Sequence, residues 1–139
     1  TPDLIIISLG TNEAIDHPYI DPKFLTQLDT LVTQLKSNNP NALFLLTTPI
    51  DFYKKKTRRN PGVEIIRSKI IEYADAHGLA YWDLYTSGGG KHSADQWKNN
   101  DLMQPDGIHF NKAGYKLQAS LLYEALIKGY NEYVRYRHP

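Results

Sequence analysis

With 139 residues the chain has the length of one domain, which at this size buries about 70% of its unfolded surface. Its 16 basic and 15 acidic residues leave a net charge of +1, and this balance favours neither a nucleic-acid nor a membrane-surface partner. The chain contains no cysteine, which excludes disulfides, thiolate metal sites and a cysteine nucleophile, and no apolar stretch approaches the ~20 residues of a membrane span.

The first part of the chain predicts two buried strands joined by an amphipathic helix. Residues 4–7 form a continuous apolar run, which is typical of a strand buried on both faces of a parallel sheet, so we expect a central strand there. Asp21-Pro22 supplies an N-cap and a proline for the first helical turn, and the helix ends at Asn39-Pro40. Its apolar face is formed by Leu25, Leu28, Leu31, Val32 and Leu35. Residues 43–46 are the second strand.

The second part of the chain repeats this pattern. Asn60-Pro61 is another cap followed by proline, and the helix after it ends at His77-Gly78. Residues 79–84 are the third strand, and residues 85–110 form a long loop with one short helix near residues 93–99. The buried face of the second helix is formed by Val63, Ile66, Ile70 and Ala74. Asn111 caps a final helix, whose apolar stripe is formed by Leu117, Leu121, Leu122, Ala125 and Leu126.

Strands and helices that alternate with short connections predict a parallel α/β sheet. In such sheets the functional residues gather beyond the carboxyl ends of the strands. Two motifs of this chain lie there. They are GTNEA, residues 10–14, after the first strand, and DGIHF, residues 106–110, at the end of the long loop.

These two motifs contain a base, an acid that orients it and an oxyanion donor, which a nucleophilic hydrolase needs in addition to its nucleophile. An aspartate three residues before a histidine can hold one ring nitrogen while the other ring nitrogen acts as a base, as Asp106 and His109 would do. Asn12, on a turn that Gly10 makes possible, can donate a hydrogen bond to a developing oxyanion. Each motif alone is more often only a turn, and the interpretation depends on finding both.

Together, GTNEA and DGIH resemble the Gly-x-Asn and Asp-x-x-His blocks of the SGNH, or GDSL-type, family of serine esterases. The resemblance implies a flavodoxin-like three-layer α/β/α fold with a parallel sheet. It also implies that Asn12 and Gly10 belong to the oxyanion side of the site, that Asp106 orients the base and that His109 is the general base. No cofactor or metal is required by this scheme. Glu13 departs from the aspartate that frequently follows the asparagine.

The family's nucleophilic serine lies in a Gly-Asp-Ser block that this sequence lacks. Of the serines present, we expect only Ser87 and Ser93 to be accessible, and neither lies on a strand-end turn. We therefore expect residues 1–139 to be the carboxyl-terminal segment of one SGNH hydrolase domain, with the serine on a companion segment. That segment would lie beside residues 4–7, and a solvated edge there would count against it.

Three further features have alternative interpretations. Trp97 and Met103 are candidates for an acyl or sugar pocket near His109, or else they pack the long loop. The run KKKTRR, residues 54–59, either binds an anionic glycan or forms a solvated loop. The solvated loop is the preferred interpretation. A metal site at Asp106 and His109 would need further ligands that the sequence does not suggest.

The leading hypothesis is a serine-dependent hydrolase that removes a small acyl group, acetyl before others, from a carbohydrate. The stretch from GLAYWDLYTSGGG to the DGIH motif resembles esterases that deacetylate carbohydrates, among them peptidoglycan O-acetylesterases. That resemblance implies a periplasmic or secreted location. The substrate would be an acylated carbohydrate or another small ester. The alternative is a non-catalytic glycan-binding or scaffold protein of the same fold.

Overall fold

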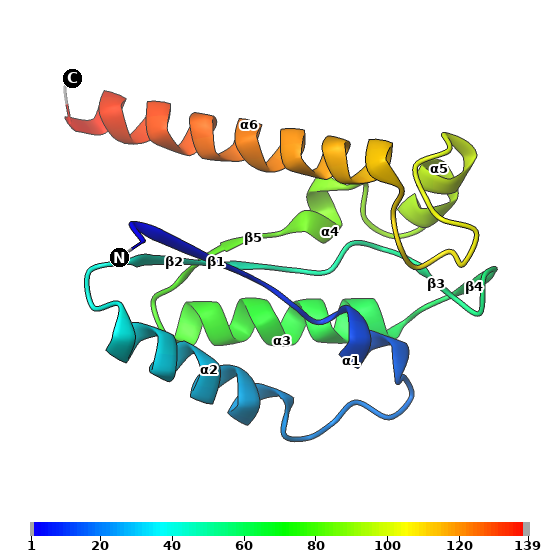
Figure 1. Cartoon of the computed structure of the whole chain (residues 1–139), viewed down its shortest axis with the longest axis horizontal. Coiled ribbons are helices and arrows are strands. Elements are labelled where there is room, and N and C mark those ends of the chain that lie inside the picture. Colours follow the sequence, from blue (N-terminus) through cyan, green and yellow to red (C-terminus); the bar gives the residue numbers. More distant parts are fainter. Residues whose placement is uncertain (1, 138–139) are drawn as a thin grey trace.

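A parallel sheet of three strands organises the protein, whose computed structural model describes residues 2–137. The strands are β1 (Leu4–Ser8), β2 (Leu43–Thr47) and β5 (Ala80–Trp82). β2 lies between the other two and is parallel to both. Figure 1 shows α2 (Phe24–Asn38) and α3 (Gly62–Ala76) on one side of the sheet and α6 (Lys112–Arg137) on the other. The parallel strands and the three layers confirm the predicted α/β fold class.

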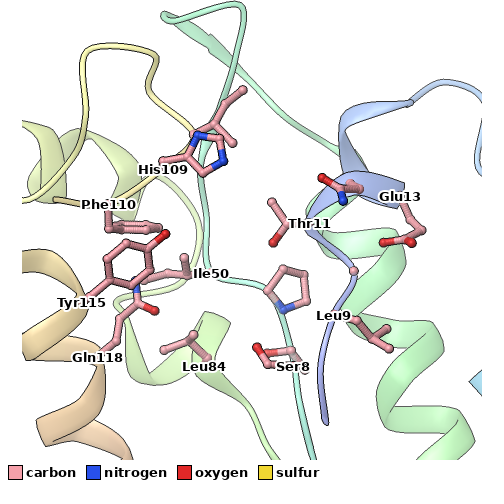
Figure 2. A pocket seen from close by; sticks show the side chains of 15 residues that line it. Ser8, Leu9, Thr11, Glu13, Ile50, Leu84, His109, Phe110, Tyr115 and Gln118 are labelled. Carbon is pink, nitrogen blue, oxygen red and sulfur yellow. The ribbon is translucent and has the colours of Figure 1, made fainter. Parts of the chain in front are cut away.

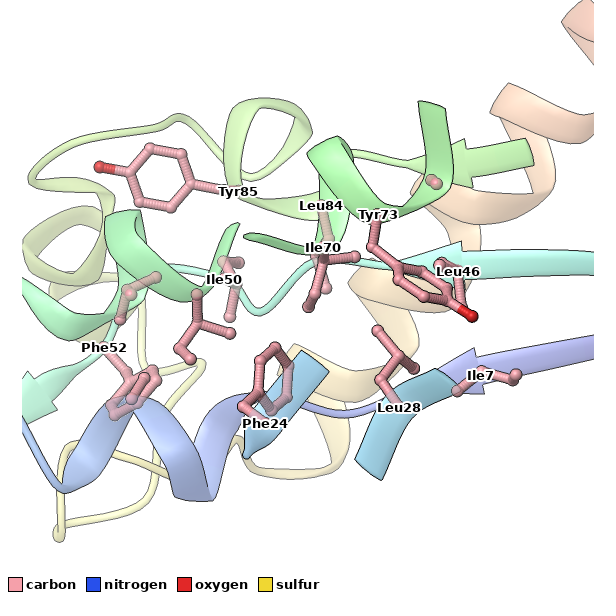
Figure 3. Close-up of a cluster of buried hydrophobic side chains, with 14 of the residues drawn as sticks. Ile7, Phe24, Leu28, Leu46, Ile50, Phe52, Ile70, Tyr73, Leu84 and Tyr85 are labelled. Carbon is pink, nitrogen blue, oxygen red and sulfur yellow. The ribbon is translucent and has the colours of Figure 1, made fainter. Parts of the chain in front are cut away.

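The hydrophobic core lies between the sheet and the two helices α2 and α3 (Figure 3). Ile7 of β1 and Leu46 of β2 point into it, and α3 contributes the fully buried Ile66 and Ile70. The crossing helices thus cover one face of the sheet, as the apolar periodicity predicted.

A polar side chain turns the backbone just before α2 and just before α3. Asp21 does not cap α2 directly. Its carboxylate accepts a hydrogen bond from the backbone N–H of Lys23 at 2.8 Å, which makes a turn before the helix starts at Phe24. Phe24 is buried, whereas Leu31 on the predicted apolar face is 37% exposed. Asn60 does not cap α3 directly either: the N-cap is Pro61, and the side-chain oxygen of Asn60 accepts a hydrogen bond from the N–H of Gly62 at 3.1 Å, which makes a turn before the helix.

β1 lies at the edge of the sheet, so the predicted central position is wrong for the described residues. It pairs with β2 from Leu4–Leu43 to Ser8–Thr47, and no strand within residues 2–137 pairs with its other side. Leu4 and Ile6 are 39% and 43% exposed. An exposed edge is the outcome that counts against a companion segment, and nothing within residues 2–137 supplies a neighbour for it, so the companion segment stays a proposal.

The segment after β5 contains two short helices, where the sequence predicted one. α5 (Ser93–Asn99) was predicted and α4 (Leu84–Ser87) was not, because β5 ends at Trp82 rather than at residue 84. Two more short strands, β3 (Tyr53–Lys54) and β4 (Arg58–Arg59), form an antiparallel hairpin after β2. We call residues 53–59 the basic hairpin.

α6 is the longest helix, and it is mostly exposed. Asn111 caps it as predicted, since its side-chain oxygen accepts a hydrogen bond from the N–H of Gly114 at 3.0 Å. The predicted buried stripe is only partly right, because Leu117 and Leu126 are 39% and 42% exposed and Gly114 is the buried residue of this helix. None of the helices described is both long and apolar enough to cross a membrane.

Candidate active site

Asp106 and His109 are hydrogen-bonded to each other in the loop before α6. The Nδ1 atom of His109 lies 2.6 Å from Oδ2 of Asp106. The second carboxylate oxygen, Oδ1, accepts hydrogen bonds from the backbone N–H groups of Ile108 at 2.8 Å and His109 at 2.9 Å. Because an ionised carboxylate only accepts hydrogen bonds, Nδ1 carries a proton and Nε2 of the neutral ring is left as an acceptor. The predicted roles of an orienting acid and a base require this arrangement.

The electrostatics of the pair keep Asp106 charged. The side-chain hydrogen bond from His109 and the backbone N–H of Ile108 lower the pKa of Asp106 to about 2. The carboxylate therefore stays ionised throughout the neutral pH range. The His109 side chain is 65% exposed, so a ligand can reach its ring.

The loop that carries this pair is held against the basic hairpin. The backbone N–H of Tyr53 in β3 donates to the carbonyl oxygen of Gly107 at 2.8 Å. Gly107 has a φ of 72°, and an added Cβ would lie 3.1 Å from Cδ2 of Tyr53. Within the loop, the N–H of Gln104 donates to the carbonyl oxygen of His109 at 2.8 Å. These contacts fix where the imidazole ring is presented.

Gly10 forms the sharp turn between β1 and α1 (Thr11–Ile15). Its φ is 108°, in the region that residues with a Cβ rarely adopt. An added Cβ would also lie only 2.6 Å from Cγ2 of Ile66 in α3. Glycine is therefore required both by the turn and by the close packing on α3. The turn places Asn12 in the first turn of α1 with its side chain exposed.

A cleft of about 390 Å³ separates this turn from the His109 loop. Three of the residues predicted from the sequence line it: Gly10, Asn12 and His109. In Figure 2, Thr11 and Glu13 lie across the cleft from His109. The cleft thus brings together two motifs that are far apart in the chain, Gly10–Asn12 and Asp106–His109. Within residues 2–137 no three His, Asp or Glu side chains gather closely enough to hold a metal ion.

Thr48 lines the same cleft and was not predicted. Its hydroxyl group donates to Oδ1 of Asp83 at 3.0 Å and accepts from the backbone N–H of Tyr85 at 3.1 Å. Burial alone would raise the pKa of Asp83, but hydrogen bonds, led by that from Arg67, lower it to about 2. Arg67 and Asp83 form a two-point ion pair, with N–O distances of 2.9 and 2.6 Å. This network joins the ends of β2 and β5 under the cleft.

The first turns of α6 also contribute to the cleft, through Tyr115 and Gln118. The ring of Tyr115 packs edge-on against Phe110 at 5.9 Å between ring centres. The Nε2 atom of Gln118 is buried and has no hydrogen-bond partner among the residues that the structure describes. The i, i+3 spacing of these two polar side chains after the Asn111 cap is the signal in the sequence that could have found them.

Trp97 and Met103 pack in the core rather than line the cleft. Trp97 is 5% exposed and Met103 is 7% exposed. The indole N–H of Trp97 donates to the carbonyl oxygen of Gly88 at 2.8 Å, and its ring meets Phe110 edge-on at 5.2 Å between ring centres. We expected Trp97 and Met103 to form a pocket near His109, and this expectation is wrong. Both side chains are buried, so neither is open to a ligand in the cleft.

The accessibility of the serines differs from the prediction. Ser93 is 1% exposed, so its predicted accessibility is wrong, while Ser87 is exposed as predicted but does not line the cleft. Ser8, which was expected to be buried in its strand, is exposed and lines the cleft. In the described part of the chain, no serine hydroxyl group is hydrogen-bonded to His109.

Several solved structures share this fold, among them three described as esterases or lipases. A peptidoglycan O-acetylesterase matches 91% of this chain with a TM-score of 0.83 and 25% sequence identity. A lipase/acylhydrolase from Enterococcus faecalis matches 90% of it with a TM-score of 0.66 and 24% identity. A GDSL-like lipase from Bacteroides thetaiotaomicron matches 92% of it with a TM-score of 0.64 and 21% identity. The chain spans only 37%, 61% and 63% of the lengths of these three proteins.

The chain belongs to the GDSL-like lipase/acylhydrolase family, whose sequence model matches residues 1–117. The match confirms the resemblance found in the sequence, and it includes both the Gly10–Asn12 turn and the Asp106–His109 loop. It ends within the first turns of α6. A search of curated proteins found no significant match.

Proposed function

We propose that the protein is a serine-dependent ester hydrolase that removes a small acyl group, acetyl before others, from a carbohydrate. The observation that carries this proposal is the hydrogen-bonded Asp106–His109 pair beside a cleft that Asn12 lines as well. Membership of the acylhydrolase family supports the ester as the bond that is cleaved.

The proposed reaction begins with the hydroxyl group of a serine outside residues 1–139. Its oxygen attacks the ester carbonyl carbon while Nε2 of His109 takes the hydroxyl proton, and Asp106 stabilises the imidazolium that forms. The amide N–H of Asn12 donates to the oxyanion, a contact that typically contributes ~100- to 1,000-fold in rate. When the tetrahedral intermediate collapses, the bond to the sugar oxygen breaks and that oxygen takes the proton from His109.

Water completes the reaction. It attacks the carbonyl carbon of the acyl-serine while His109 takes one of its protons. The bond to the serine oxygen then breaks, the serine recovers a proton from His109, and the acyl group leaves as a carboxylic acid, which releases its remaining proton to the solvent. No cofactor or metal enters this scheme.

The serine in this proposal lies on a companion segment, so that residues 1–139 are the carboxyl-terminal segment of one SGNH hydrolase domain. The outer edge of β1 is unpaired within residues 2–137, so a neighbouring strand has a place to bind, although this exposed edge does not itself favour one. The unpaired Nε2 of Gln118 at the cleft supports such a segment, because a buried donor without an acceptor is unfavourable. The structural relatives are also longer than this chain.

The carbohydrate part of the proposal has a narrower basis. It rests on the resemblance of the loop sequence to carbohydrate deacetylases and on the likeness to a peptidoglycan O-acetylesterase. A periplasmic or secreted location belongs to the same proposal.

Labelling with a fluorophosphonate, which reacts with activated serines, tests the proposal in the full protein. We expect one adduct, on a serine outside residues 1–139, and loss of p-nitrophenyl acetate hydrolysis after labelling. His109→Ala is expected to lower kcat/KM by about 1,000-fold or more and to slow labelling. His77→Ala is the matched control, since His77 is also exposed and lies 3.6 Å from an aspartate, Asp29, but does not line the cleft.

Each result separates the candidate functions. Absence of both labelling and hydrolysis would overturn the hydrolase proposal in favour of a non-catalytic glycan-binding or scaffold protein. An adduct on Ser8 that abolishes hydrolysis would retain the hydrolase and remove the companion segment from the reaction.

A further inference from the structure

The basic hairpin lies directly beside the loop that carries His109. In addition to the hydrogen bond between Tyr53 and Gly107, an added Cβ on Gly107 would be 3.2 Å from the carbonyl oxygen of Lys56. The turn of the hairpin therefore packs against this loop. In Figure 2 the ribbon of the hairpin extends past the His109 ring, on the side away from Leu84. A ligand in the cleft that projects beyond His109 meets the hairpin.

Most of the charge on the hairpin is not neutralised. Five of the six residues 54–59 are basic. Arg59 pairs with Glu64 at 2.6 Å, and the Lys54 ammonium group donates to the backbone carbonyl oxygen of His17. Apart from Lys54, three cations of the hairpin have no acidic partner within 4.0 Å among residues 2–137: Lys55, Lys56 and Arg58. All three are exposed.

A further cation approaches the same hairpin from α5. The Nζ atom of Lys98 lies 5.1 Å from the centre of the Tyr53 ring and donates to the carbonyl oxygen of Lys56 at 3.4 Å. It also has no ion-pair partner in the described part of the chain. The positive charge is therefore shared by two elements that flank the His109 loop.

Two of the lysines occupy backbone conformations that disfavour lysine. The φ angles of Lys55 and Lys56 are 53° and 69°, in the left-handed region where glycine and asparagine are favoured. A turn selected for stability alone would have those residues. Strained positions of this kind often occur where a ligand is held, so the two lysines are consistent with a role for their charge.

We propose that these cations bind carboxylate groups of the substrate, so that the ester in the cleft is carried by an acidic oligosaccharide. This inference rests on the proposed hydrolase function and narrows its substrate from carbohydrate to carboxylate-bearing carbohydrate. Exposed ammonium and guanidinium groups attract carboxylates at close range while they stay hydrated. Because the whole chain has a net charge of only +1, the hairpin is a local feature, unlike the broad positive surface that binds a nucleic acid.

Direct binding tests the hairpin without ester cleavage. The full protein is titrated by calorimetry with trigalacturonate and with neutral galactotriose. We expect trigalacturonate to bind about tenfold more tightly at low salt, and the preference to shrink as salt shortens the range of the attraction. The double variant Lys55→Asn/Lys56→Asn is expected to lose most of the preference. Asparagine is chosen because it tolerates the left-handed conformation, so the turn is kept.

A second double variant controls for net charge. Lys116→Gln/Lys128→Gln removes two exposed lysines of α6 and is expected to bind trigalacturonate like the unchanged protein. Equal affinity for the acidic and neutral sugars would overturn the inference, and so would an equal loss in the two double variants. Tighter binding of an oligonucleotide with the same number of charges would overturn it in favour of nucleic acid.

The two proposals fail in different ways. Ester hydrolysis without a preference for the acidic sugar would remove the hairpin inference and leave the hydrolase. Binding of the acidic sugar through the hairpin, in a protein that hydrolyses no ester, would remove the hydrolase and leave a receptor for acidic glycans.

Discussion

The Asp106 carboxylate accepts three hydrogen bonds, one from the His109 ring and two from backbone N–H groups of its own turn. Asp106→Asn keeps an oxygen for the turn and loses the charge. The pKa of Asp106 is lowered from 3.8 to about 2 by the His109 hydrogen bond first, so its ionised form stabilises the folded state above about pH 4. That contribution is lost as the pH falls from about 4 to about 2.

We therefore expect Asp106→Asn to be less stable at neutral pH and to approach the unchanged protein in strong acid. The difference at pH 7 is expected to be about 1 kcal/mol or less, because the pair is exposed to solvent. Urea denaturation between about pH 7 and pH 2.5 measures it. A difference that grows as the pH falls would contradict the assigned direction of the pKa shift.

Gly10 sets the position of Asn12 at the same residue scale. Gly10→Ala combines an unfavourable φ of 108° with a Cβ only 2.6 Å from Ile66, so we expect it to destabilise the protein by about 2–4 kcal/mol. Gly78→Ala is the matched control, since Gly78 has a φ of 60° and nothing lies within 4 Å of an added Cβ. It should cost only about 1 kcal/mol. Equal losses in urea denaturation would mean that the contact with α3 does not constrain the turn.

Among the elements, α6 combines two unlike halves. Its first turns contribute Tyr115 and Gln118 to the cleft and bring Gly114 so close to the loop that an added Cβ would lie 2.1 Å from the carbonyl oxygen of Leu102. From residue 126 to residue 137 every side chain is exposed. The family match also ends at residue 117. The site thus depends on the start of the helix.

Truncation tests this division of α6. Removing the chain from Lys128 onward is expected to change the free energy of unfolding by less than about 1 kcal/mol, because exposed side chains contribute little. Leu28→Ala, in the buried face of α2, should cost about 2–5 kcal/mol in the same measurement. A loss of that size on truncation would show that the exposed half of α6 has a packing partner.

For the whole molecule, the cleft is built from two independently supported walls. On one side of the cleft, the turn before Asn12 packs against α3 through Gly10. On the other side, the loop that carries His109 contacts the basic hairpin through Gly107. Thr48 and its bonds to Asp83 and Tyr85 join strands beneath them. Supports of this kind hold catalytic groups in place without direct contact between the walls.

Sequence reasoning succeeded where a local rule decides the structure. The asparagine that caps α6, the asparagine that turns the chain before α3 and the glycine that ends α3 act through hydrogen bonds to backbone a few residues away, so their neighbours in the chain are enough to identify them. The continuous apolar run of β2 correctly indicated a buried strand. The two candidate motifs were found for the same reason, as short patterns with defined chemistry.

Three of the failures involve partners that are distant in the sequence. The run at β1 looks like that of β2, but which strands flank it depends on the sheet as a whole. Trp97 is a ligand candidate until Gly88 takes its N–H and Phe110 packs against its ring. Thr48 enters the site only because Asp83 and Tyr85 fold over the end of β2. No local pattern encodes such contacts.

The open edge of β1 has a practical consequence. If the serine lies on a companion segment, as proposed, that segment supplied as a separate polypeptide would join the edge and restore hydrolysis only while the two polypeptides are bound. The appearance of yellow nitrophenol from p-nitrophenyl acetate would then rise with the concentration of the second polypeptide and level off. The concentration at half of the maximal rate would report the dissociation constant for adding one strand to a parallel sheet, without a fluorescent label on either partner.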